Sequence, residues 1–180
     1  MRFLALLLLA TLLPLMADNK QKLFELYQRG EYINACNLGF RGLTYFQNDE
    51  AYISLYAFSC LKADMIDRLS APIGALNQTK EARANAAYFA VIQMQKKLLM
   101  QALWDNQPIK NLSFPTSAYL LSKIFDLYLK NPQPDQSIKV YTDPLNNRLS
   151  YKLYTTVSNG RKSIAVDEYY DKILTMHHVY

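Results

Sequence analysis

Apolar side chains recur every three or four positions over most of the first 131 residues, and this spacing is typical of amphipathic helices. Capping residues and Gly or Asn stops divide the pattern into segments. Helices are predicted over residues 18–29, 31–46, 49–62, 65–69, 79–106 and 117–131. The stretch SAPIGALNQ, residues 70–78, breaks the pattern and is expected to be a loop.

After residue 131 the apolar pattern changes to strict alternation, which predicts strands. Asn159-Gly160 is a two-residue turn signal, and it sets a hairpin in which Thr155 faces Ile164 and Leu153 faces Val166. Residues 137–142 supply a third strand, whereas residues 167–180 read either as a terminal helix or as another strand. The expected fold is therefore α+β and mainly α, with a helical domain over residues 18–131 and a small antiparallel β region over residues 132–180.

The N-terminus has the layout of a secretory signal peptide over residues 1–17. Arg2 precedes an apolar run from Phe3 to Leu15, and Ala17 offers a small residue for cleavage. The alternative is an uncleaved membrane anchor, but the run is shorter than the roughly 20 residues of a spanning helix and contains Pro14. We expect an exported, periplasmic protein that is not integral to the membrane once the signal is removed.

Composition narrows the class of partner. Half of the chain is apolar and only 19% is charged, which argues against disorder. The net charge of +5 is spread along the chain, and Lys96-Lys97 is a tight basic pair. A nucleic-acid surface needs clustered basic residues, so no nucleic-acid partner is expected.

The chain contains two cysteines, Cys36 and Cys60. In an oxidising compartment this even number favours one disulfide between them. The alternative is a pair of buried thiols that pack as small apolar residues.

The segment YQRGEYINACNLG, residues 27–39, resembles the tetratricopeptide repeat, whose period is about 34 residues. Gly30, Tyr32 and Ala35 match the turn and first contacts of that family's helical hairpin, and Ala57 matches a close-packing position of the next unit. Gly39 and Gly42 depart from the family, which has a large aromatic residue and an alanine there. The resemblance covers about residues 20–70 and implies stacked helical hairpins that bind other proteins.

The motifs that could carry chemistry are weak. His177 and His178 are adjacent, so on a regular element their side chains point apart and cannot chelate one ion. A nucleophile built from Cys36 or Cys60 with His177 is disfavoured, because helix burial opposes the thiolate. The sequence SCLK, residues 59–62, matches S-x-x-K of penicillin-interacting enzymes, but the accompanying motifs are missing. We therefore predict no catalytic residue, no metal site and no cofactor.

Tyrosine is the residue type that stands out, with 14 in the chain and eight of them after residue 118. Tyrosine is favoured at protein interfaces because it provides area and a polar group at small entropic cost. The candidate binding surface comprises Tyr52, Tyr56, Tyr151 and Tyr154; the alternative is that the tyrosines cover a thin sheet. The predicted function is a non-catalytic scaffold or adaptor that binds another envelope protein, for example in a flagellar motor. The alternatives are a cell-wall or peptide hydrolase and a carrier of a small ligand or metal.

Overall fold

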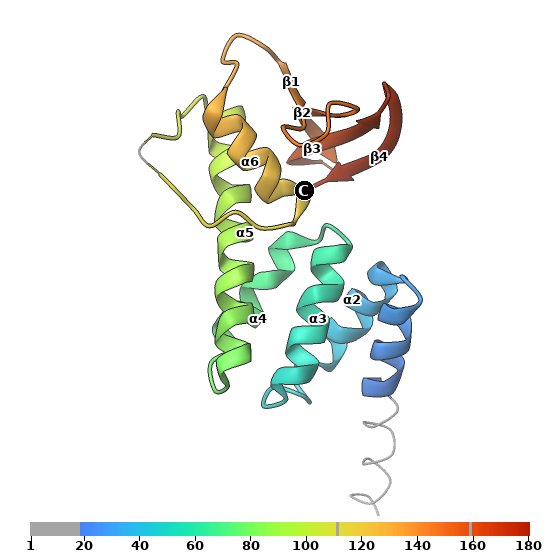
Figure 1. Ribbon diagram of the computed structural model, residues 1–180. Coiled ribbons are helices and arrows are strands. Elements are labelled where there is room, and N and C mark those ends of the chain that lie inside the picture. The colour runs from blue at the N-terminus through green and yellow to red at the C-terminus, as the bar shows by residue number, and fades with distance from the viewer. Residues whose placement is uncertain (1–18, 111, 159) are drawn as a thin grey trace, which may run out of the picture. The chain divides into compact units, whose positions relative to one another are not determined.

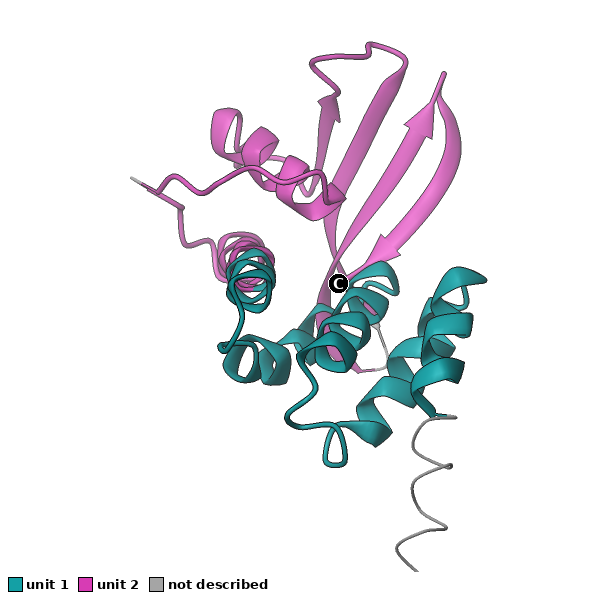
Figure 2. Cartoon of the chain, turned by 60° about the horizontal axis from the view of Figure 1, so that its bottom comes forward, with its two compact units in different colours: residues 1–89 teal, residues 90–180 magenta. Residues whose placement is uncertain are grey.

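The computed structural model describes residues 19–110, 112–158 and 160–180. The chain divides into two compact units, residues 1–89 and residues 90–180, which Figure 2 distinguishes by colour. The predicted signal peptide, residues 1–17, lies outside the described residues. Within them, no helix combines the length and the apolar character needed to cross a membrane.

The first unit is helical, as the periodicity predicts (Figure 1). A helix over residues 19–28 is followed by α2 (Tyr32–Gly42), α3 (Glu50–Lys62), the 3₁₀ turn η1 (Ile66–Leu69), α4 (Ser70–Ala75) and the first part of α5 (Lys80–Trp104). The expectation of a loop over residues 70–78 is wrong for Ser70–Ala75. Pro72 is tolerated there because it lies in the first turn of α4, where its missing N–H has no helical partner.

Side-chain oxygens cap the N-termini of two of these helices. Asp49 accepts a hydrogen bond from the backbone N–H of Tyr52 at the start of α3, and Thr79 accepts one from Ala82 at the start of α5. The Glu50 carboxylate accepts three further bonds from the backbone N–H groups of residues 77–79. Glu50 therefore ties the start of α3 to the start of α5.

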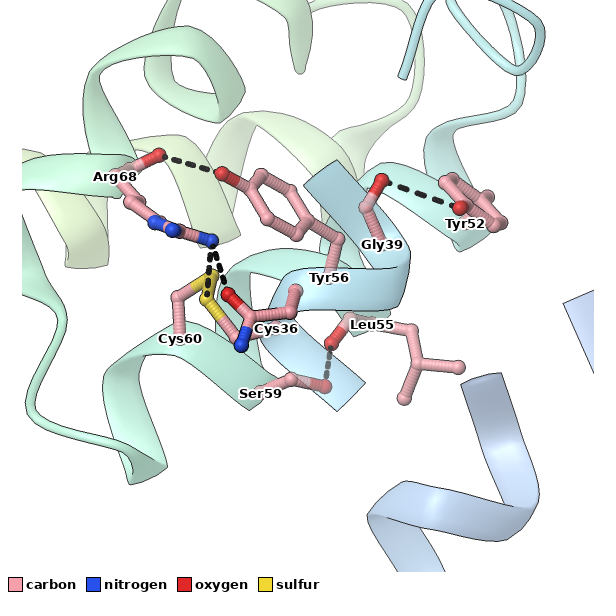
Figure 3. The surroundings of a disulfide bond; sticks show 9 residues. Cys36, Gly39, Tyr52, Leu55, Tyr56, Ser59, Cys60 and Arg68 are labelled. Carbon is pink, nitrogen blue, oxygen red and sulfur yellow. Dashed lines mark hydrogen bonds between the residues drawn. A yellow bond between two sulfur atoms is a disulfide. The ribbon is translucent and has the colours of Figure 1, made fainter. Parts of the chain in front are cut away.

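Two glycines of α2 accommodate two tyrosines of α3. Gly39 lies against the ring of Tyr56, and Gly42 lies against Tyr52, whose hydroxyl donates to the Gly39 carbonyl at 3.1 Å (Figure 3). Both tyrosine side chains are fully buried. Tyr52 and Tyr56 are thus core residues, and their assignment to an exposed binding surface is wrong. The tyrosine rings occupy the space that larger residues at the two glycines would need.

The second unit combines the end of α5 with α6 (Leu120–Lys130) and four strands: β1 (Ile138–Thr142), β2 (Leu149–Ser158), β3 (Arg161–Tyr170) and β4 (Ile173–Val179). The strands form an antiparallel meander in the order β1-β2-β3-β4. The α+β class, mainly α with a C-terminal antiparallel sheet, is therefore confirmed.

The hairpin register also agrees with the prediction, since Thr155 faces Ile164 and Leu153 faces Val166. Asn159 of the turn lies outside the described residues, while Gly160 has the positive φ (+73°) that a tight turn requires. For residues 167–180 the strand reading is right and the terminal helix is wrong. Asp171 and Lys172 both adopt positive φ and form a second tight turn, which folds β4 back along β3.

Helix α6 covers one face of the sheet (Figure 2). This face carries buried Tyr151, Leu153, Ile164 and Val166. Tyr141 of β1 donates to the carbonyl of Asn131, the residue that follows α6. Tyr151 is therefore another core residue, and its assignment to an exposed surface is wrong.

A buried carboxylate joins α6 to the sheet. Asp143 Oδ2 accepts hydrogen bonds from Lys123 Nζ and from the Tyr151 hydroxyl, each at 2.8 Å, and Oδ1 accepts the backbone N–H groups of Leu145 and Asn146. The bond from Lys123 is the largest cause that lowers the pKa of Asp143 to about 2. Asp143 therefore stays ionised and holds the β1–β2 connection against the helix.

Candidate functional site

An open four-stranded sheet has two edges, and here they are β1 and β4. The outer side of an edge strand presents backbone N–H and C=O groups that no strand of the sheet satisfies. Such a row can pair with an added strand from another protein. The two edges of this sheet differ in how those groups are used.

The β1 edge is closed by a side chain. Gln133 donates from its Nε2 to the carbonyl of Val140 at 2.8 Å and accepts the Val140 N–H on its Oε1 at 3.0 Å. An amide side chain thus makes the pair of bonds that a neighbouring strand would make. An incoming strand would have to displace Gln133 before it could pair with β1.

The β4 edge carries no such cover among the described residues. Ile164 and Tyr180 exchange both backbone hydrogen bonds, at 2.9 and 3.3 Å, which fixes the alternation along this ladder. Residues in an antiparallel strand alternately face toward and away from their partner strand. Val179 and His177 therefore direct their N–H and C=O groups outward, and the structure gives these groups no partner within residues 19–110, 112–158 and 160–180.

Apolar side chains flank this open edge. Ile173, Leu174 and Met176 of β4 are 70%, 52% and 54% exposed. Leu174 lies on the face of the sheet opposite α6, whereas Met176 and Ile173 lie on the α6-bearing face. An extended segment that paired with β4 would meet apolar side chains above and below it.

The paired histidines lie on this strand, on opposite faces. His177 Nδ1 lies 2.6 Å from Asp167 Oδ1, and the Tyr154 hydroxyl donates to the same carboxylate at 3.3 Å. His178 Nε2 lies 3.1 Å from Glu168 Oε1. Both histidine rings thus contact carboxylates of the neighbouring strand β3. Within the described part of the chain, no three metal-ligating side chains come together.

The two cysteines form a disulfide that joins α2 to α3, with Cα atoms 4.7 Å apart (Figure 3). This confirms the predicted pairing, and the alternative of two buried free thiols is wrong. Arg68 Nη1 lies 3.7 Å from Cys36 Sγ and donates to Asn37 Oδ1 at 3.0 Å, so the bridge is packed beneath a guanidinium group. With both sulfurs bonded, neither cysteine is the thiol that a Cys-His nucleophile needs.

Most of the residues predicted for the repeat turn and for the binding surface pack within the fold. Gly30 adopts a positive φ of +74° at the turn before α2, and Tyr32 packs edge-on against Tyr27. Ala35 and Ala57 are fully buried. Of the four tyrosines assigned to a binding surface, only Tyr154 is partly exposed, and its hydroxyl contacts Asp167 on the face of the sheet opposite α6.

Comparisons with known protein families, curated proteins and solved structures find no match for this chain. The likeness to the tetratricopeptide repeat therefore stays a prediction.

Sequence reasoning missed Gln133 and the asymmetry of the edges. The apolar residues Ile173, Leu174 and Met176 can be identified in the sequence, but their spacing fits a helix as well as a strand. Gln133 bonds to Val140, seven positions later, and this contact requires β1 to turn back past the end of α6.

Proposed function

We propose that this chain is a non-catalytic exported binding protein that takes up an extended segment of another envelope protein as an added strand beside β4. The observation that carries the proposal is the contrast between the two edges. Gln133 covers β1, whereas β4 offers outward backbone groups at His177 and Val179. Exposed strand edges are ordinarily protected. A sheet with one covered edge and one open edge therefore favours a binding role for the open edge.

The chemistry of the edge indicates the partner segment. Ile173, Leu174 and Met176 offer apolar contacts on both faces of β4. A matching segment would be extended, with apolar side chains on both of its faces, and main-chain hydrogen bonds would supply much of its affinity. A component of an envelope assembly, for example of a flagellar motor, is the kind of partner that we propose.

Two further observations support an exported setting. The apolar N-terminal run has the layout of a signal peptide. The Cys36–Cys60 disulfide is typical of proteins that fold in an oxidising compartment.

Site-specific photocrosslinking in intact cells tests the proposal. A benzophenone amino acid at Leu174 on β4 should yield an adduct with one envelope protein. The same probe at Val140 is the matched control, because Val140 is 50% exposed on the same face but lies on the covered β1 edge. Equal adducts from both positions, or no adduct from position 174, would contradict strand addition at β4.

A pair of charge substitutions adds an affinity measurement with the captured partner. Leu174→Lys should weaken binding about tenfold or more, since a lysine on an edge strand opposes the approach of an apolar strand. Val140→Lys should leave the affinity unchanged. Thermal unfolding of both variants separates lost binding from lost folding, and loss of binding in both would place the contact on the sheet face.

A further inference from the structure

The second unit contains a pocket of about 690 Å³ beside α5, α6 and β1. This volume lies within the range of small-molecule sites in proteins. Leu103 and Tyr128 form part of its wall, together with Pro108, Pro132 and Pro134 from the connecting segments. The pocket therefore combines an apolar part with the polar side chains of Asn106, Gln136 and Ser137, and it is large enough for an organic ligand.

A buried lysine lines this pocket. Lys139 of β1 lies on the core-facing side of the sheet, opposite Leu153 and two residues before Tyr141. The residue is only 6% exposed. Lysine is rarely buried to this degree unless its charge is paired. A position that the sheet pattern reserves for the core is thus occupied by a cation.

The charge of Lys139 has no counterion among the described residues. Its Nζ donates to the backbone carbonyl of Gln136 at 2.7 Å, and no carboxylate lies within 4 Å of it in this part of the chain. An ammonium group has three donors, so two remain for another acceptor. Desolvation lowers the pKa of Lys139, as expected for a charge removed from water without a compensating anion.

We infer that this pocket binds a small organic monocarboxylate with an apolar body, whose carboxylate accepts hydrogen bonds from Lys139 Nζ. A single buried cation matches a single negative charge, and the aromatic and proline walls match an apolar body. The one acidic side chain among the described lining residues, Asp135, is itself exposed. The inference uses α5, α6 and β1, and it does not depend on strand addition at β4.

Titration calorimetry with decanoate tests the inference on the whole chain. Decanoate should bind at one site, and 1-decanol, which has the same tail without the charge, should bind at least about tenfold more weakly, because a charge-assisted hydrogen bond is lost. Equal affinity for the two probes, or no binding of decanoate, would overturn the proposal. This comparison uses the unaltered protein and does not require that any variant fold.

Lys139→Met removes the charge while keeping a similar length, and it should lower decanoate affinity at least about tenfold and bring it to that of 1-decanol. Lys130→Met is the matched control, because Lys130 of α6 is exposed and does not line the pocket. Its decanoate affinity should equal that of the unaltered protein. Lys139→Met should also melt at the same or a higher temperature, because it removes an unpaired buried charge. Unchanged decanoate affinity in folded Lys139→Met would refute the role of Lys139.

Discussion

The replacement of Gly39 by alanine tests the packing of α2 against α3, because two effects of opposite sign compete there. Alanine is favoured over glycine in a helix interior by about 1 kcal/mol. A Cβ at position 39, however, would lie 2.7 Å from Cδ2 and 2.9 Å from Cβ of Tyr56. Both separations are well below van der Waals contact, so either the tyrosine or the helix must move.

Tyr56 has little room to move. Its side chain is fully buried, and its hydroxyl donates to the carbonyl of Arg68 at 3.3 Å. The nearby disulfide also limits how far α2 can separate from α3. Overpacking of a filled core costs about 1–3 kcal/mol, so the clash should exceed the helix-propensity gain and leave a net loss of about 1 kcal/mol.

Gly74→Ala is the control for helix propensity alone. Gly74 lies in α4, is exposed, and has no atom within 4 Å of its would-be Cβ. This variant should therefore gain up to about 1 kcal/mol. Urea unfolding followed by circular dichroism, with the disulfide intact, should separate the two variants by about 2 kcal/mol. Equal stabilisation by both substitutions would refute the tight contact between Gly39 and Tyr56.

The disulfide and the Asp143 network yield two further stability predictions. Replacement of both Cys36 and Cys60 by alanine should lower the free energy of unfolding by about 3 kcal/mol, since the bond closes a loop across 24 positions. Alkylation of the unfolded, unreduced protein should label neither cysteine, and labelling would contradict the bond. The folded pKa of Asp143, about 2, is lower than its unfolded value, so its contribution is present above about pH 4 and lost as the pH falls toward 2. Asp143→Asn should therefore lower stability by up to about 2 kcal/mol at pH 6 and have little effect near pH 2, and an equal loss at both pH values would contradict the role of the charge.

Most of the element order could be predicted because it depends on local periodicity. The spacing of apolar residues predicts α3 and α5 to within about two residues at each end. The hairpin of β2 and β3 could be predicted with its register, because the Asn-Gly turn and the two apolar faces agree. The error at Ser70–Ala75 has a local cause, since a proline in the first turn of a helix resembles a proline that breaks one.

The candidate site was harder to predict because its parts are distant in sequence or depend on burial. Tyrosine content alone does not distinguish an interface from a core, and Tyr52, Tyr56 and Tyr151 proved to be core residues. The close approach of α2 to α3 at Gly39 explains this for Tyr56, since a glycine leaves a space that a ring from another helix can fill.

The amino-acid sequence by itself determined most of the helices and the β2–β3 register, because these depend on short-range periodicity and turn residues. Only the tertiary structure decided which sheet edge is covered and which buried charge is unpaired. Gln133 can bond to Val140 only when β1 lies between β2 and the residues that follow α6. The same arrangement buries Lys139 away from water. These contacts join elements by position in space, and no local pattern in the chain encodes them.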